Sequence, residues 1–391
     1  MIAALLLTQC TKRKNPVDVN EPGGLYFTVQ IRSAAIENDI MQDPPYRSVQ
    51  VYTPPGYNAS DTTTRYPVLY LLHGYGGTDT YFRGLFGLKE SMDDMINSGK
   101  IKPMLVVTPD ASNQLGGGFY TNSPDINGTS YAGRMQDFIT NEVVAKIDST
   151  FNTIPDRAHR AIAGHSMGGY GAIKIAMLRP DLFCATASMS APLSFWGNMP
   201  NPPEGVPQFK GIFELIGQVF AENNGVPGDV AVYNSITPGP GKRVTNMMFA
   251  MAASFSPHDP ATPSQYAHRF TTQTFSGYVD LPFDSSGAPA MSVWSRWMAN
   301  DVLAIFAGGG AGVFDSTALY FDAGNADDLG LQYHAQVFEG AIQVANAYGM
   351  HIAYKSAVYA GDDAWYPADH TMWIGERIKD VVAFSDSVFN K

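Results

Sequence analysis

The amino-acid sequence predicts an α/β fold, with a mostly parallel central sheet and helices on both of its faces. Short apolar runs alternate with segments of helical periodicity over most of the 391 residues. The run 66–72, Tyr-Pro-Val-Leu-Tyr-Leu-Leu, is apolar on both faces, as a central parallel strand is. Since 45% of the residues are hydrophobic and only 16% are charged, the composition is that of a folded core.

The expected elements run through the chain in an alternating order. Two antiparallel leading strands come first, and the parallel strands follow, so that we expect strands at 27–31, 48–52, 66–72, 104–108, 159–163, 183–189, 317–321 and 352–359. Helices are expected between and after them, at 88–98, 135–149, 172–178, 331–348 and 371–389. This alternation places helices on both faces of the sheet.

Residues 192–314 interrupt the alternation with a stretch rich in Pro, Gly, Met and Trp. A structureless loop of that length is uncommon in a compact domain. Helical periodicity near 209–222, 244–255 and 291–306 therefore predicts a helical cap over the sheet edge, inserted into one domain of residues 25–391. Its large apolar side chains either pack the cap or line a substrate pocket; they are Trp196, Met247, Met248, Met251, Trp294 and Trp297.

The N-terminal residues 1–24 are expected to form a signal or lipoprotein segment and a linker. The first ten residues are apolar up to Cys10 and are followed by Lys12-Arg13-Lys14, which resembles a clipped bacterial lipoprotein signal. We therefore expect a secreted, periplasmic or lipid-anchored protein, with a cytoplasmic location as the alternative. No apolar run approaches the roughly 20 residues of a membrane-spanning helix. The formal net charge of −11 disfavours nucleic acid as a partner.

The strand-to-helix junction at 161–171, Ala-Ile-Ala-Gly-His-Ser-Met-Gly-Gly-Tyr-Gly, carries the clearest chemical signal. Ser166 lies on the turn, and Gly164 and Gly168 two residues to either side allow a close approach of the backbones. Such a nucleophile elbow lifts the serine hydroxyl above the sheet edge. The sequence predicts that Ser166 is a nucleophile, with a glycine-rich turn and a solvent-facing serine as the alternative.

A serine nucleophile needs a base that takes its proton and an acid that orients the base. In folds with this elbow the acid follows a late strand and the histidine follows the last strand. His370 is the histidine in the loop beyond the last expected strand, so it is the predicted base. Three carboxylates follow the strand 317–321, and position alone leaves Asp322, Asp327 and Asp328 open as the acid.

Backbone amides are expected to stabilise the oxyanion of the reaction. The amide of Met167, directly after the nucleophile, is one expected donor, and that of Tyr75 in the loop after the first central strand is the other. His165, Trp294 and Trp297 are expected at the substrate pocket. The chemistry requires no cofactor, and the acidic pairs at 327–328 and 362–363 lack the spacing of a calcium loop, so we expect no metal.

Four segments together resemble the esterase D and feruloyl esterase group of α/β-hydrolases: 51–57, 66–74, the elbow and 322–327. The resemblance covers about residues 25–195 and 315–390. It implies a serine carboxylic ester hydrolase that works through an acyl-enzyme, with Asp327 as the acid, His370 as the base, and Tyr75 and Met167 as oxyanion donors.

The resemblance also bears on substrates and on alternative functions. It implies feruloyl or acetyl esters of sugars or plant polysaccharide as substrates, and siderophore esters as an alternative. Acyl transfer to a bound alcohol is a second enzymatic reading of the same fold. A binding module that has kept the fold without its chemistry is the non-enzymatic reading.

Overall fold

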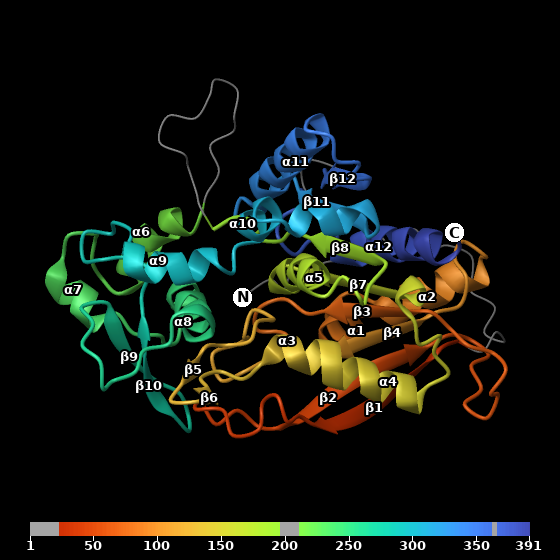
Figure 1. Cartoon of the computed structure of the whole chain (residues 1–391), viewed down its shortest axis with the longest axis horizontal. Coiled ribbons are helices and arrows are strands. Elements are labelled where there is room, and N and C mark those ends of the chain that lie inside the picture. The colour runs from red at the N-terminus through yellow and green to blue at the C-terminus, as the bar shows by residue number, and fades with distance from the viewer. Residues whose placement is uncertain (1–22, 196–210, 362–365) are drawn as a thin grey trace, which may run out of the picture.

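The computed structural model describes residues 23–195, 211–361 and 366–391 (Figure 1). Cys10, Trp196 and the pair Asp362-Asp363 lie outside these residues, so what the sequence predicts for them stays a prediction. Within the described ranges, no helix combines the length and the apolar character needed to cross a bilayer.

The central element is an eight-stranded sheet in the order β1-β2-β4-β3-β7-β8-β11-β12. Its strands are β1 (Leu25–Arg32), β2 (Tyr46–Thr53), β3 (Val68–Leu72), β4 (Leu105–Pro109), β7 (Arg160–His165), β8 (Ala185–Met189), β11 (Ala318–Gly324) and β12 (Tyr354–Tyr359). The pairs β1–β2 and β2–β4 are antiparallel, and all other pairs in this sheet are parallel. The predicted α/β class with a mostly parallel sheet is confirmed.

Helices cover both faces of this sheet (Figure 1). They are α1 (Tyr81–Leu85), α2 (Leu88–Asn97), the continuous run of α3 (Met135–Asp137), the π-helical η1 (Phe138–Val143) and α4 (Val144–Thr150), then α5 (Met167–Leu178), α11 (Leu331–Ala347) and α12 (Ile374–Phe389). Short connections contain the 3-10 turns η2 (Arg157–His159) and η3 (Gly310–Asp315) and the small hairpin β5 (Asp125–Ile126) with β6 (Thr129–Ser130).

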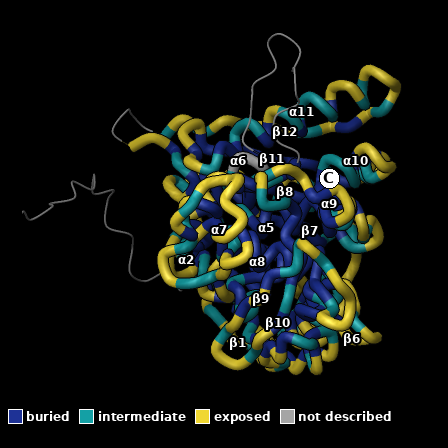
Figure 2. The backbone as a smooth tube through the Cα atoms, turned by 90° about the vertical axis from the view of Figure 1, so that its left-hand side faces the viewer, coloured by how far each residue is buried: buried dark blue, intermediate teal, exposed yellow. Residues whose placement is uncertain are grey.

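Strand β3 shows why the central strands are apolar on both faces. Val68, Tyr70 and Leu72 belong to the core that includes α4, α5 and α11, whereas Leu69 and Leu71 belong to the core that includes α2 and α12. Side chains alternate between the two faces of a strand, so a sheet between two helical layers needs apolar residues at every position. The buried centre of the molecule is visible in Figure 2 along β7, α5 and β8.

The insertion forms a cap at one end of the sheet (Figure 1). It contains the expected helical pieces as α6 (Ile212–Glu222), α8 (Arg243–Phe255), α9 (Met291–Met298) and α10 (Val302–Ala307), together with α7 (Val230–Ser235). It also contains a hairpin that the sequence did not predict, β9 (Ala267–Thr271) with β10 (Ser276–Asp280). Its buried positions include His268 and Asp280, and these polar residues interrupt the apolar alternation that marks a strand.

Helix α5 is joined to the cap by polar contacts of two buried side chains. The Tyr170 hydroxyl donates to the backbone oxygen of Asn300 at 2.6 Å. Lys174 Nζ donates to Asn300 Oδ1 at 2.7 Å and also contacts Thr121 Oγ1. Burial lowers the pKa of Lys174 to about 7, from an ordinary value of 10.5, because the charged ammonium is poorly solvated there.

We expect the free energy of unfolding to depend on pH through the protonation of Lys174. Between pH 7 and 10.5 the unfolded chain protonates this lysine and the folded chain does not, so the free energy of unfolding rises with pH over this window. Relative to Lys174→Met, the parent should gain about 1 kcal/mol per pH unit. Urea unfolding of both proteins at pH 7.5, 8.5 and 9.5 measures this, and parallel profiles would show that the lysine does not titrate there.

Candidate active site

Ser166 lies at a sharp corner between β7 and α5. Its backbone has φ 56° and ψ −119°, outside the regions common for residues other than glycine. Its N–H donates to the backbone oxygen of Met189 at 2.8 Å. A Cβ at Gly164 would lie 2.3 Å from the carbonyl carbon of Gly168, and one at Gly168 would lie 2.0 Å from the oxygen of Leu72. Both neighbours of the corner are glycines because the backbones leave no room for a side chain.

Gly168→Ala is expected to destabilise the fold by about 3 kcal/mol or more, because the new methyl group would meet backbone that cannot move without distorting β3. The matched control is Gly340→Ala in helix α11, where a Cβ would meet nothing within 4 Å. There the exchange should stabilise by about 0.5–1 kcal/mol, as glycine-to-alanine exchanges in helices do. Urea unfolding compares the two, and similar effects at both positions would contradict the steric argument.

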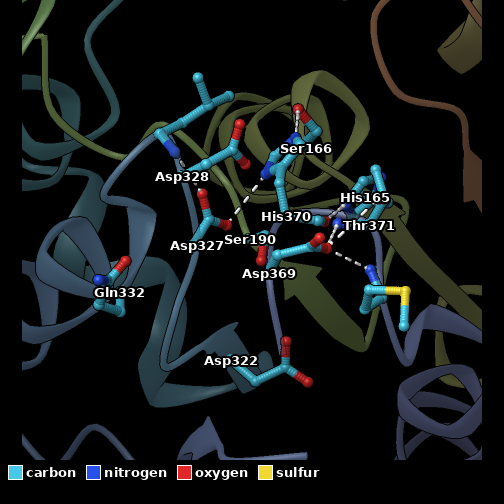
Figure 3. Close-up of polar contacts among 12 residues, drawn as sticks. His165, Ser166, Ser190, Asp322, Asp327, Asp328, Gln332, Asp369, His370 and Thr371 are labelled. Carbon is cyan, nitrogen blue, oxygen red and sulfur yellow. Dashed lines mark hydrogen bonds and ion pairs between the residues drawn. The ribbon is translucent and has the colours of Figure 1, made fainter. Parts of the chain in front are cut away.

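His370 lies between Ser166 and Asp327 (Figure 3). Its Nε2 is 2.9 Å from Ser166 Oγ, and its Nδ1 is 3.0 Å from Asp327 Oδ2. The side chain of Asp327 has no exposed surface, and its second oxygen accepts the N–H of Leu329 at 3.0 Å. The structure thus brings together the three residues that the sequence proposed as nucleophile, acid and base.

The charge state of Asp327 determines which ring nitrogen of His370 carries the proton. Burial raises the pKa of Asp327, but hydrogen bonds from His370, from the Leu329 N–H and from Ser190 outweigh it, so this pKa lies below its ordinary value. The carboxylate is therefore ionised at neutral pH and accepts the proton of His370 Nδ1. In a neutral imidazole the other nitrogen is then an acceptor, so Nε2 accepts the Ser166 hydroxyl.

The two other carboxylates that position left open occupy different surroundings. Asp328 is exposed, and its Oδ2 is 3.5 Å from Arg243. Asp322 is buried, and its Oδ1 accepts Arg377 Nε at 3.0 Å. Figure 3 shows Asp322 apart from the row of Ser166, His370 and Asp327. Neither has a hydrogen bond to His370 among the contacts of the described residues.

His165 lies behind the candidate base rather than at a substrate pocket. Burial, with the neighbouring His370 and Arg377, lowers the pKa of His165 well below its usual range, so its ring is neutral. Its Nε2 is 2.8 Å from the backbone oxygen of His370 and donates to it. Nδ1 must then accept, and it receives the Tyr81 hydroxyl at 2.8 Å. This chain of hydrogen bonds fixes the backbone of the His370 loop.

An apolar cavity opens beside Ser166, with about 540 Å³ of empty space, part of it open to solvent. Only about 50 Å³ of it admits the centre of a water molecule, so the cavity is narrow. Its walls come from the sheet edge, the cap, the loop after β11 and the first turn of α11: Tyr75, Phe119, Met167, Pro192, Gly211, Leu215, Met247, Met251, Leu329, Leu331 and His334. Tyr75 and Met167, the predicted oxyanion donors, both lie at this cavity with Ser166.

The predicted pocket residues of the cap divide into two groups. Met247 and Met251 line the cavity. Trp294 and Trp297 do not; both are fully buried, their rings lie 6.3 Å apart, and Trp297 Nε1 donates to Ser256 Oγ at 2.8 Å. Met248 is buried as well and is not part of the cavity wall. The two tryptophans thus pack the interior of the cap.

Two features of the site were not predicted from the sequence. Ser190 has φ 46°, and its hydroxyl contacts both Asp327 and Arg377 Nη2, the latter at 3.0 Å. The glycine run 116–118 packs against the two predicted donors, since a Cβ at Gly117 would lie 2.6 Å from the sulfur of Met167 and one at Gly116 would lie 2.9 Å from the ring of Tyr75. In the sequence, the signal that could have indicated this packing was the glycine run itself, which follows a strand end.

Three comparisons with known proteins bear on this site. The family model described as "Putative esterase" matches residues 44–224. An endo-1,4-beta-xylanase/feruloyl esterase of Xylanibacter ruminicola is 37% identical over 145 residues, which are 35% of this chain and 18% of that protein. An esterase of Mycobacterium tuberculosis is 35% identical over 150 residues, which are 37% of this chain and 29% of that protein. This chain therefore matches less than a third of the length of either relative.

Solved structures share the fold over nearly the whole chain. A ferulic acid esterase has a TM-score of 0.56 at 19% identity, covering 94% of this chain and 99% of its own. An S-formylglutathione hydrolase from Agrobacterium tumefaciens has a TM-score of 0.54 at 17% identity, covering 93% and 95%. At these identities the likeness concerns the fold alone. The segment 44–224, which is similar to that esterase family model, carries Ser166 and most of the parallel sheet, and it is part of an α/β-hydrolase fold.

Proposed function

We propose that this protein is a serine carboxylic ester hydrolase. The observation that carries the proposal is the continuous hydrogen-bonded row from Ser166 through His370 to Asp327, at 2.9 and 3.0 Å, with Ser166 in the wall of a narrow apolar cavity. The family match of the segment around Ser166 supports the same reaction class. The geometry is that of a nucleophile with its base and its orienting acid.

In the proposed reaction Ser166 Oγ forms a bond to the ester carbonyl carbon while its proton passes to His370 Nε2. The carbonyl oxygen gains the negative charge of the tetrahedral intermediate. The carbon–oxygen bond to the alcohol then breaks, and His370 Nε2 returns the proton to the leaving oxygen. A water molecule repeats both steps on the acyl-enzyme, so an acid and a free serine result. Asp327 keeps Nδ1 protonated and stabilises the charge that His370 gains.

The amides of Tyr75 and Met167 are proposed to receive the developing oxyanion. Met167 is the first residue of α5, and amides in the first turn of a helix have no partner within the helix. The helix end also favours negative charge there. Tyr75 is held by its hydroxyl, which donates to the backbone oxygen of Leu115 at 2.6 Å. The loop that presents its amide is thus fixed before substrate binds.

The narrow apolar cavity favours a slender or planar acyl group. The proposed substrates are feruloyl or acetyl esters of sugars or plant polysaccharide, a proposal supported by the name of the Xylanibacter ruminicola relative, an endo-1,4-beta-xylanase/feruloyl esterase. Plant polysaccharide lies outside the cell, and we propose export with a lipid anchor at Cys10, because the chain is apolar up to that cysteine and basic after it.

A panel of acetyl, butyryl, octanoyl and feruloyl esters of one alcohol tests this proposal. We expect hydrolysis of at least one of these esters, with labelling of Ser166 by a fluorophosphonate found by mass spectrometry of the peptide that contains it. A sharp preference for acetate would exclude the feruloyl group. Product partition with added sugar separates hydrolysis from acyl transfer. A parent that neither turns over any ester nor takes the label would contradict the proposal.

A further inference from the structure

A network of buried polar groups lies behind the candidate acid. Arg377, in α12, has no exposed surface, and its Nε and Nη2 both contact Asp322 Oδ1 in β11, with Nε at 3.0 Å. The other oxygen of Asp322 accepts the Tyr320 hydroxyl at 2.9 Å. Arg377 Nη2 also donates to Ser190 Oγ at 3.0 Å. Two charges of opposite sign are thus paired in the core, and a serine hydroxyl is hydrogen-bonded to the pair.

The directions of the hydrogen bonds connect this ion pair to Asp327. A guanidinium can only donate hydrogen bonds, and an ionised carboxylate can only accept them. Ser190 lies beside Asp327 (Figure 3). The hydroxyl of Ser190 therefore accepts from Arg377 and donates its one proton to Asp327. The hydrogen bonds thus run without a gap from the ion pair through Ser190 to the residue that contacts His370.

The backbone of Ser190 is fixed directly after β8. Its N–H donates to the backbone oxygen of Asp322 at 2.8 Å, and Met189, the residue before it, accepts the N–H of Ser166. The φ angle of Ser190 is 46°, in the left-handed region that disfavours residues other than glycine. Backbone strain of this kind concentrates at functional sites. Glycine would suit this backbone better, which indicates that the site uses the hydroxyl.

Asp327 has to keep one orientation in the proposed reaction. Its Oδ2 must face His370 Nδ1, because that contact keeps the proton on Nδ1 and leaves Nε2 to accept from Ser166. The loop that carries Asp327 also provides a contact, from the Leu329 N–H, but this donor is only two residues away and moves with the loop. The contact from Ser190 comes from a different element and is anchored by two charges in the core.

We propose that Ser190 is a positioning residue of the reaction. Through its hydroxyl, the buried ion pair of Arg377 and Asp322 holds the carboxylate of Asp327 toward the base. This inference rests on the proposed ester hydrolysis, and it adds residues that act through the acid. Neither Ser190 nor the ion pair lines the apolar cavity beside the nucleophile.

The variants Ser190→Ala and Ser190→Gly test the role of the hydroxyl. Both remove the contact to Asp327, so kcat for the ester that the parent hydrolyses fastest should fall about 10- to 100-fold, the range of a lost hydrogen bond to a charged group. KM should stay within about twofold, because Ser190 does not line the cavity. Ser190→Gly should melt at a higher temperature than Ser190→Ala, since glycine adopts this φ angle without strain.

The difference between these two variants separates positioning from a purely structural role. If Ser190 only stabilised the fold, kcat would recover in the more stable glycine variant, and that recovery would overturn the inference.

Each variant of Ser190 has a matched control. Ser188→Ala removes a buried hydroxyl two residues earlier, which has no hydrogen-bond partner among the described residues. Asn224→Gly places glycine at another left-handed position, with φ 65°, in the cap. Both controls should keep kcat within about twofold of the parent. Losses as large as those of the Ser190 variants would show that the effect is not specific to the contact with Asp327.

A double variant tests the path from the ion pair. Arg377→Lys keeps a positive charge for Asp322, but it replaces the planar fork of donors by one nitrogen, so the contact to Ser190 should be lost. It should therefore lower kcat as Ser190→Ala does. Adding Ser190→Ala should lower kcat by no more than about a further twofold, because both changes break the same connection. Losses that multiply would overturn the network.

A proton NMR signal reports on the acid without any turnover. The proton between His370 Nδ1 and Asp327 should give a low-field signal in the parent, identified by its loss in Asp327→Asn. In Ser190→Ala we expect this signal to broaden and move upfield, because the carboxylate is held less firmly. An unchanged or downfield-shifted signal would overturn the positioning role even where esters are hydrolysed. If the signal changes as expected but the parent hydrolyses no ester, the proposed function falls and the positioning of Asp327 stands.

Discussion

Replacing Ser166 with alanine is expected to lower kcat/KM for every ester by about 10⁴- to 10⁶-fold. The exchange removes the only atom of the row that can form the acyl-enzyme, and neither His370 nor Asp327 can replace it. The variant should keep a residual activity, because water can still attack the bound ester and the oxyanion donors and substrate binding still assist that attack. Steady-state kinetics and fluorophosphonate labelling measure the loss, while the melting temperature should stay within a few degrees.

A neighbouring serine provides the control for Ser166. Ser188 is buried in β8, and among the described residues its hydroxyl has no hydrogen-bond partner. Ser188→Ala therefore removes a hydroxyl of the same kind from the same region without touching the row, and kcat/KM should stay within about twofold. If Ser166→Ala kept more than a hundredth of the parent's activity while Ser188→Ala lost it, the assignment of the nucleophile would be wrong.

The sequence predicted the sheet better than the cap for a physical reason. Strands buried between two helical layers are apolar at every position, and β3 stands out from its surroundings on that basis alone. The hairpin of β9 and β10 buries polar groups instead: both ring nitrogens of His268 lie 2.8 Å from backbone oxygens, and Asp280 pairs with Arg296 at 2.6 Å. In a sequence, polar residues at these positions resemble those of a loop, so the two strands were not predicted.

Pocket residues were harder to predict, because periodicity shows that a helix has a buried face but not what that face meets. Met247 and Met251 are four residues apart and share a face of α8, and that face lines the cavity. Met248 directly follows Met247 in the chain, so its side chain lies on a different face of the helix. In α9 the spacing of Trp294 and Trp297 is as regular, yet their face meets the interior of the cap.

The second large effect is expected at Asp327, and its neighbour Asp328 provides the control. The two residues are of the same type, but only Asp327 contacts His370. Asp327→Asn should lower kcat about 10³- to 10⁴-fold. An asparagine that turns its amide N–H toward His370 Nδ1 makes that nitrogen an acceptor, which places the proton on Nε2 and leaves nothing there to accept the Ser166 hydroxyl. Asp328→Asn should change kcat by less than about twofold, because its side chain is exposed and pairs only loosely with Arg243.

The pH dependence of stability separates the two aspartates independently of catalysis. Because the folded state lowers the pKa of Asp327, this carboxylate stabilises the fold at neutral pH, and the stabilisation is lost as pH falls through its folded-state pKa. The stability difference between the parent and Asp327→Asn should therefore shrink in acid. Asp328→Asn should change the free energy of unfolding at neutral pH by less than about 0.5 kcal/mol, because its side chain is exposed. A large kcat loss in Asp328→Asn with Asp327→Asn unaffected would require the loop after β11 to turn the other carboxylate toward His370. The contact between Asp327 Oδ1 and the Leu329 N–H holds the loop against that turn.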